Sequence, residues 1–275
     1  MLERCWLRTL FAIFLLPTIA SLAQSGEYQS TSFQYLPPSW AERVVFYHTF
    51  DQGTEKPDIN LIQAKLDGTA ADGEGLTGLA YQCGKDSKHK ALRLKSSALS
   101  PHQPITVMCW FRLDAPMKEE SGFGLIGLSS PRGYVSYFVH GKGEWCALRE
   151  PKGITQVQNF KGIPRINNCE GPRIWFEPGT WHHIAITVSS AKVIKVFQDG
   201  VECDEISLKG GTLKEGDFDL ATFGAGENEH PQSIDDVLVL DRALDAGEIA
   251  EYVKSTLALA AIHFPVRSQP APVRP

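Results

Sequence analysis

Beyond residue 23, this 275-residue sequence lacks an apolar run long enough to span a bilayer, which takes about 20 residues. It also has no C-x-x-C pair, no G-x-S-x-G elbow, no H-E-x-x-H motif and no Walker loop. These absences remove the signatures of a zinc knuckle, a serine hydrolase, a zincin and a P-loop NTPase. The formal net charge of −5 argues against nucleic acid or an anionic membrane as the main partner.

The N-terminus does contain an apolar run, from Leu10 to Ala20, with two arginines before it. Small residues at alternate positions follow and end at Ala23, as signal peptidase requires. We therefore predict that residues 1–23 are a signal peptide and that the protein is secreted or lies in the periplasm or cell envelope. An uncut anchor is the alternative, but the run contains Pro17 and is short for a membrane span.

Five cysteines remain after that cleavage, and outside the cytosol pairs of cysteines tend to form disulfides. An odd number leaves at least one thiol unpaired within the chain. Cys109 shares a strand face with apolar residues, so we expect a buried free thiol there. Cys146 and Cys169 bracket a segment rich in Gly and Pro that a disulfide would stiffen. That all five are reduced remains equally open.

Short apolar and β-branched runs, separated by Gly, Pro and Asp, recur along most of the chain and predict an all-β sandwich. One helix is expected near the C-terminus, with Asp245 as N-cap, Glu248 completing a capping box, and Ile249, Val253 and Leu257 on the buried face. Before it, Asp241 and Arg242 are expected to form an ion pair in a turn. The strands are expected at residues 44–50, 91–95, 105–113, 123–128, 134–139, 154–160, 173–176, 181–188, 193–198, 201–208, 218–223 and 234–240.

The regions outside this pattern are polar or rich in Pro. Residues 24–43 form a polar leader, and residues 264–275 form a Pro-rich tail that we expect to stay extended and disordered. The folded domain is therefore predicted to span residues 44–256. About 250 mature residues suffice for one large core, and β-sandwiches of that size are commonly single domains.

Four segments in this order resemble a known family. They are Phe46–Gly53 with "F-D-x-G", Ile105–Leu113 with Trp110 at an aromatic position, Trp181-x-His-I-A with the later Asp199-Gly200, and Ile234–Leu244 with "I-D-D-V-x-V-x-x-R-A-L". Together they are similar to the bacterial-type laminin G-like, concanavalin A-like jelly rolls. The resemblance implies a two-sheet antiparallel β-sandwich with one short C-terminal helix. Segment 141–175 departs from the family pattern as an elongated loop region.

The resemblance also implies a calcium ion near the rim of the sandwich. Calcium takes several oxygen ligands, often Asp carboxylates with loop carbonyls. Asp51 of "F-D-x-G" and Asp235 or Asp236 of "I-D-D" are the expected ligands. The alternative is that these acids cap turns or accept backbone hydrogen bonds.

Because many glucanases share this fold, the resemblance also raises glycoside hydrolysis by an acid pair as a possible activity. Retaining glycosidases need two carboxylates about 5 Å apart. The glucanases of this fold place them at alternate positions on a single strand. The nearest match is Glu202-Cys-Asp-Glu205, where Glu202 and Asp204 would share one strand face and Glu205 the other. The spacing differs from the glucanase pattern, so we expect no catalytic residues and no enzyme activity. The adjacent His182 and His183 should point to opposite faces and cannot share a metal.

A carbohydrate platform needs exposed aromatic rings beside polar side chains. Trp145, Trp175, Tyr134 and Tyr137, in or next to the elongated loop region, are the candidate contacts. Trp110 and Trp181, together with His183 and Ala185, are instead expected to pack within the sandwich. We predict an exported, non-catalytic recognition or adhesion module for a glycan or an envelope or surface protein. The alternatives are a glycan-active hydrolase and a structural subunit of a surface assembly.

Overall fold

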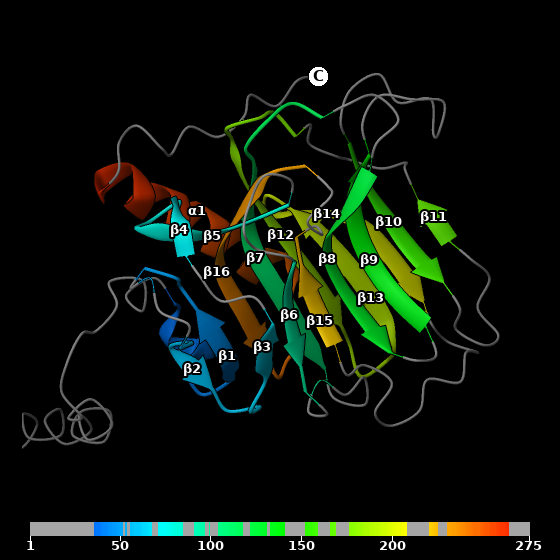
Figure 1. Ribbon diagram of the computed structural model, residues 1–275. Coiled ribbons are helices and arrows are strands. Elements are labelled where there is room, and N and C mark those ends of the chain that lie inside the picture. Colours follow the sequence, from blue (N-terminus) through cyan, green and yellow to red (C-terminus); the bar gives the residue numbers. More distant parts are fainter. Residues whose placement is uncertain are drawn as a thin grey trace, which may run out of the picture.

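In the computed structural model, the chain forms two stacked β-sheets and one C-terminal helix (Figure 1). The predicted signal peptide and Pro-rich tail lie outside the described residues, as do Cys146, Cys169, Trp145 and Trp175. No helix in the described part of the chain is both long and apolar enough to cross a membrane. The described residues are 36–51, 53, 56–67, 71–84, 91–96, 99, 104–117, 122–130, 133–140, 152–158, 166–168, 176–207, 220–224 and 230–263.

The larger sheet, here called sheet I, has nine strands whose pairings are antiparallel. Its first and last strands along the chain, β1 and β16, are hydrogen-bonded neighbours, so the two ends of the domain meet. In spatial order the strands are β14 (Val201–Ser207), β13 (Val193–Gln198), β12 (Trp181–Val188), β7 (Ile105–Leu113), β16 (Gln232–Leu240), β1 (Val44–His48) and β2 (Ile59–Asn60), with β5 (Leu79–Cys83) also on β16 and β4 (Ala71–Glu74) on β5.

The second sheet, sheet II, has seven strands and is also antiparallel. The two-sheet antiparallel sandwich predicted from the sequence is therefore confirmed. In spatial order its strands are β11 (Ile166–Asn168), β10 (Lys152–Gln158), β9 (Gly133–His140), β8 (Gly122–Ser130), β15 (Leu220–Phe223), β6 (Leu92–Lys95) and β3 (Lys65–Asp67).

The main core lies between the two sheets. Val107 and Ile186 of sheet I belong to the same buried cluster as Leu94 and Val135 of sheet II. Each of these side chains is removed from water on folding, which is worth about 1.5–3 kcal/mol for a buried Val, Leu or Ile. Cys109 belongs to this cluster as a free thiol, as predicted, and burial raises its pKa. Cys83 and Cys203 are also buried.

A second core covers the opposite face of sheet I. Helix α1 (Ala246–His263) packs there, together with Trp40 of the 3₁₀ helix η2 (Pro38–Trp40). Trp110, Trp181 and Ala185 lie in this core, under Tyr252 and other helix residues. The prediction that these residues are buried is confirmed, but they pack against α1, whereas their strand neighbours Ile184 and Ile186 fill the space between the sheets.

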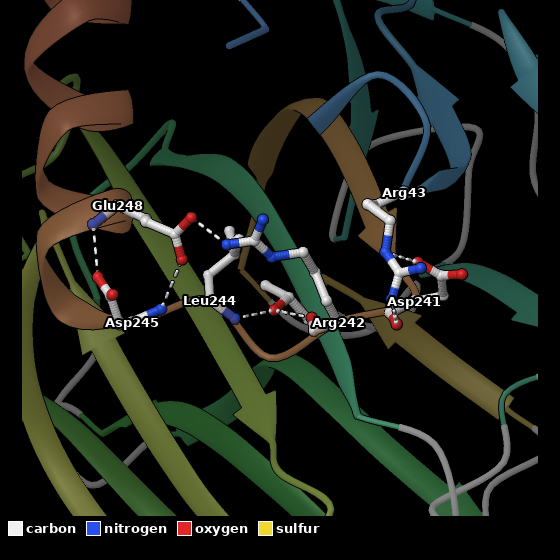
Figure 2. Close-up of polar contacts among 7 residues, drawn as sticks. Arg43, Asp241, Arg242, Leu244, Asp245 and Glu248 are labelled. Carbon is white, nitrogen blue, oxygen red and sulfur yellow. Dashed lines mark hydrogen bonds and ion pairs between the residues drawn. The ribbon is translucent and has the colours of Figure 1, made fainter. Parts of the chain in front are cut away.

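The start of α1 has the predicted capping box (Figure 2). The Glu248 N–H donates to Asp245 Oδ1 at 2.9 Å, and the Asp245 N–H donates to Glu248 Oε2 at 3.1 Å. Two backbone donors that the helix cannot satisfy by itself are thereby paired. Ile249, Val253 and Leu257 then face sheet I as expected.

The predicted ion pair between Asp241 and Arg242 is wrong (Figure 2). Asp241 Oδ1 lies 3.0 Å from Arg43 Nε, just before β1, and the Arg242 guanidinium instead contacts Glu248. Neighbouring residues of an extended chain point in opposite directions, so each finds a partner on another element. These contacts tie the β16–α1 connection to the start of β1 and to the first turn of the helix.

Candidate functional site

Described polar side chains remain accessible across the outer face of sheet II. Strand β9 shows this most clearly, because Val135, Tyr137 and Val139 are buried in the main core. The residues that alternate with them, Tyr134, Ser136 and Phe138, are only half-buried. Such alternation is typical of an antiparallel sheet with one face in water. Sheet I has no equivalent central surface, because α1 covers it.

A hollow of about 190 Å³ lies in this part of sheet II. It is centred on strands β8 and β9 and reaches β15. The strand register places Gly127 of β8 directly between Ser136 of β9 and Thr222 of β15. A missing side chain at that point leaves space between the two hydroxyl-bearing neighbours. The lining residues are Gly124, Ile126, Gly127, Leu128, Ser129, Tyr134, Val135, Ser136, Thr222 and Gly224.

Gly127 is not required by the backbone at this position. Its φ is not among the positive values of the chain, and an added Cβ would meet the Val135 carbonyl oxygen at 3.4 Å and Ser136 Cβ at 3.5 Å, close to ordinary van der Waals contact. Glycine within a strand weakens it and often marks a site where another molecule approaches closely. The hollow was not predicted from the sequence, although this glycine between two strand-forming stretches was the signal that could have revealed it.

One edge of the hollow combines an aromatic ring with hydroxyl groups. Tyr134 and Ser129 are opposite each other in the β8–β9 register, and both are half-buried. An aromatic ring offers an apolar face for a sugar ring, and hydroxyls can donate and accept hydrogen bonds with sugar hydroxyls. Of the aromatic residues predicted to contact a sugar, Tyr134 therefore lies at a surface hollow.

Tyr137 lies on the other face of β9 and is fully buried. Its O–H donates to Gln198 Oε1 of β13 at 2.6 Å, so it links the two sheets. A buried ring offers no face to a ligand, and we therefore remove Tyr137 from the candidate contacts. The error came from treating two residues three positions apart on one strand as neighbours, although they point to opposite faces. Trp145 and Trp175 stay predictions, because they lie outside the described residues.

The predicted calcium ligands form a second polar cluster, around strand β16 of sheet I. Asp235 and Asp236 on β16 are both buried. Asp235 Oδ2 accepts hydrogen bonds from the backbone N–H groups of Leu76 (2.8 Å) and Thr77 (3.3 Å). Its Oδ1 accepts one from the N–H of Asp236 at 2.8 Å. Asp235 therefore anchors the loop between β4 and β5.

Asp236 and Asp51 complete this cluster. The Tyr47 O–H donates to Asp236 Oδ1 at 2.9 Å. Burial, followed by the nearby charge of Asp51, raises the pKa of Asp236 to about 8, and burial with the charges of Asp236 and Asp51 raises the pKa of Asp235 well above its usual value. Asp51 packs against Gly78, because a Cβ on that glycine would collide with its carboxylate.

These residues do not fit a calcium cage as they lie. Within the described ranges, no group of three or more His, Cys, Asp or Glu side chains is arranged to hold a metal ion. Both oxygens of Asp235 already accept backbone hydrogen bonds, which is the loop-capping alternative that the sequence left open. Calcium binding by Asp51, Asp235 and Asp236 stays a prediction.

The acids of β14 are divided between the two faces of sheet I. A bulge in the β13–β14 ladder places Glu205 opposite Lys195, Asp204 opposite Val196 and Glu202 opposite Phe197. Glu202 and Glu205 both contact Lys195 Nζ at 3.0 Å, whereas Asp204 is buried and accepts a hydrogen bond from Thr155. The expectation that Glu202 and Asp204 share a face is therefore wrong, because the bulge adds a residue and reverses the alternation.

The two adjacent histidines point to opposite faces of β12, as predicted. His182 Nδ1 lies 2.7 Å from Asp199 Oδ2, on the side of the main core. His183 is fully buried under α1, between the rings of Trp110 and Tyr252 at 5.3 and 5.4 Å. Burial lowers the pKa of His183 to about 4, so it is neutral at pH 7. Both histidines contribute to the structure of the sheet and cannot bind one metal together.

Comparison with known proteins agrees with this architecture. The sequence model of the family described as "Concanavalin A-like lectin/glucanases superfamily" matches residues 86–250. Among curated proteins, none matches this sequence.

Solved structures share the fold at low sequence identity. One concerns cell entry of botulinum neurotoxin type C, dependent upon interaction with two ganglioside molecules; it has a TM-score of 0.59 and 11% identity, and the match covers 79% of this chain and 52% of that chain. The binding domain of botulinum neurotoxin DC in complex with rat synaptotagmin II gives the same four values. The binding domain of Paraclostridial Mosquitocidal Protein 1 has a TM-score of 0.56 and 13% identity, with 78% and 53% covered. This chain thus spans about half the length of these structures.

Proposed function

Because the chain belongs to the concanavalin A-like lectin/glucanases superfamily, we propose that it is a non-catalytic recognition module that binds a glycan at the hollow of sheet II. The observation that carries this proposal is the hollow around Gly127, with Tyr134 at its edge and hydroxyl side chains on either side. Binding domains with this fold, including those of the ganglioside and synaptotagmin structures, support a binding role for the architecture.

The composition of the hollow suits a sugar. Ser129, Ser136 and Thr222 each bring a hydroxyl group, and these are spread over three neighbouring strands about 4.8 Å apart. A glycan lying across the strands would meet one such group at each strand while one ring rests on Tyr134. Binding sites of this kind use an apolar surface with a few placed polar groups that fix the orientation of the ligand.

A hydrolase is the less favoured function. Glycoside hydrolysis needs two carboxyl groups flanking the scissile bond. None of the residues that line the hollow is Asp or Glu. The acids of β14 face two different sides of sheet I, and Asp235 is held by backbone N–H groups.

We propose that recognition takes place outside the cytoplasm, on the basis of the predicted signal peptide. N-terminal sequencing of the protein from its native host should begin at or near Gln24. Intact Met1 on soluble protein from a cytoplasmic fraction would contradict export.

The test of the glycan proposal is a panel of immobilised polysaccharides probed with the full mature chain. We expect retention without release of reducing ends, and loss of retention in Gly127→Thr, which fills the hollow with a side chain that strands favour. Val201→Thr, which places the same side chain on an exposed position of sheet I, is the matched control and should be retained like the wild type.

The other outcomes separate the remaining functions. Reducing ends released by the wild type would indicate a hydrolase. Retention on no polysaccharide, with binding to an envelope protein, would place this chain among protein-binding modules. If the protein binds neither a polysaccharide nor an envelope protein, the remaining function is that of a structural subunit of a surface assembly.

A further inference from the structure

We propose that the ligand of the hollow is an acidic polysaccharide, whose carboxylate or sulfate groups contact Lys65 and Lys95. This inference rests on the proposed function and names the chemical class of its glycan. It comes from the two strands beyond the hollow, β6 and β3, which continue the outer face of sheet II past β15.

The strand register places two lysines in one line with the hollow. Tyr134 of β9 is opposite Ser129 of β8, which is opposite Leu220 of β15. Leu220 is opposite Lys95 of β6, and Lys95 is opposite Lys65 of β3. Directly paired residues of adjacent strands project to the same face of a sheet. One row across sheet II therefore leads from the aromatic edge of the hollow to two cations.

Both lysines are exposed, and no ion pair of the described residues involves either of them. Like charges directly opposite each other on neighbouring strands destabilise a sheet. The pair Lys65–Lys95 thus costs stability in the free protein, and a bound anion would remove that cost. Arg93, also exposed on β6, lies in the next row between Thr222 and Asp67, so its register partner is an acid.

This arrangement contrasts with the rest of the protein. The whole chain has a formal net charge of −5, so an anionic polymer is repelled on average and is attracted only where cations gather. From β9 to β6 there are three strand spacings, or about 14 Å. A short run of sugar rings lying across the strands can therefore contact Tyr134 at one end and the lysines at the other.

The test uses two pairs of polymers that differ in charge: polygalacturonate with its methyl ester, and dextran sulfate with dextran. The charged polymer carries carboxylates in the first pair and sulfates in the second. The two pairs therefore distinguish which of these anions the protein binds. The proteins are the wild type, Lys65→Glu/Lys95→Glu, Gly127→Thr and the charge-matched control Lys192→Glu/Lys254→Glu, whose substitutions lie in the β12–β13 turn and on α1.

We expect the wild type to bind at least one acidic polymer about tenfold or more tightly than its neutral counterpart. Lys65→Glu/Lys95→Glu should lose about tenfold or more of that affinity, because two exposed charge contacts change sign, while the control double variant keeps it. Rising salt should weaken the binding, since exposed charges are screened over about 8 Å at physiological ionic strength.

The outcomes distinguish an incorrect ligand class from an incorrect binding site. Equal binding of charged and neutral polymers, weakened by Gly127→Thr and not by the lysine reversals, would overturn the acidic ligand and keep the glycan site. Equal effects of the two double variants would also overturn it. Binding that neither Gly127→Thr nor the lysine reversals change would overturn the site itself. Binding of neutral polymers alone would refute the acidic ligand.

Discussion

The two sheets of this sandwich differ in how many of their faces are covered. Every residue of β12 and β16, in sheet I, is buried, because the main core lies on one face and α1 with its neighbours on the other. Strand β9 of sheet II alternates buried and half-buried residues. The difference teaches where a ligand can bind: both faces of sheet I are used for packing, whereas sheet II keeps an accessible face that the proposed glycan can reach.

The buried indoles of sheet I should give the largest effect on stability. Trp110 is 0% and Trp181 is 5% exposed, and both pack beneath α1. Trp110→Ala and Trp181→Ala should each lower the free energy of unfolding by about 3–5 kcal/mol, through lost burial and the cavity left behind. Tyr134→Ala, on sheet II, should cost about 1 kcal/mol or less.

Denaturant unfolding of the three variants tests this difference. Unchanged stability of a soluble Trp181→Ala protein, or a loss in Tyr134→Ala as large as that in Trp110→Ala, would show that the two sheets are not divided between stability and recognition.

The next largest effect should be a pH dependence of the free energy of unfolding, caused by His183 in sheet I. The folded protein lowers the pKa of His183 to about 4, compared with 6.5 for an unperturbed histidine. Above about pH 6.5 the side chain is neutral in both states, so its contribution is complete there. As the pH falls from 6.5 towards 4, only the unfolded state takes up the proton, and stability is lost, by about 3 kcal/mol in all.

The variant His183→Leu removes this group while keeping an apolar side chain under α1. The difference in unfolding free energy between wild type and variant should shift in favour of the variant as the pH is lowered from 7 to 4. A difference that stays constant over that range would mean that His183 is not the buried neutral group described above.

Asp235 should give a smaller effect. In Asp235→Ala the N–H groups of Leu76, Thr77 and Asp236 lose their acceptor, which should cost about 1–3 kcal/mol. Thermal melting of the wild type in excess calcium and in chelator tests the calcium site predicted from the sequence, and identical curves would leave Asp235 as a loop anchor alone. A higher melting temperature in calcium that Asp51→Asn abolishes would instead establish the calcium site predicted from the sequence.

The smallest effect should come from the hollow. Gly127→Thr should leave the free energy of unfolding unchanged or raise it by up to about 1 kcal/mol, because a strand gains by losing a glycine and an added Cβ would make close to ordinary van der Waals contacts. Thermal melting checks this, with Val201→Thr for comparison. A loss of several kcal/mol would mean that glycine is needed at position 127 for the packing of the strands and not to leave space for a ligand. It would argue against the proposed binding role of the hollow.

Much of the sandwich could be predicted from the sequence. The alternation of Ile105–Leu113 and the Asp199-Gly200 turn predicted strands and a hairpin, and both turn residues do adopt positive φ. The capping box predicted the start of α1. These features depend on local physics, namely the strand period, a turn that tolerates positive φ, and a reciprocal hydrogen bond.

The features that could not be predicted depend on which elements cover each face of a sheet. Local sequence patterns carry no information about that. The pattern of β12 could not show that His183 and Trp181 face the helix, because both faces of that strand are buried. The bulge in β13–β14 that separates Asp204 from Glu202 has no sequence signature here. The short strands β2 to β5 and the register that aligns Lys65 and Lys95 with Tyr134 arise from long-range pairing.

Amide hydrogen exchange with and without a retained polysaccharide tests most directly whether sheet II is the recognition face. We expect slower exchange confined to β8 and β9 and, with an acidic ligand, to β6, while α1 and β14 exchange as in the free protein. Slower exchange in α1 or at the β14 edge, with none in β8 and β9, would contradict it.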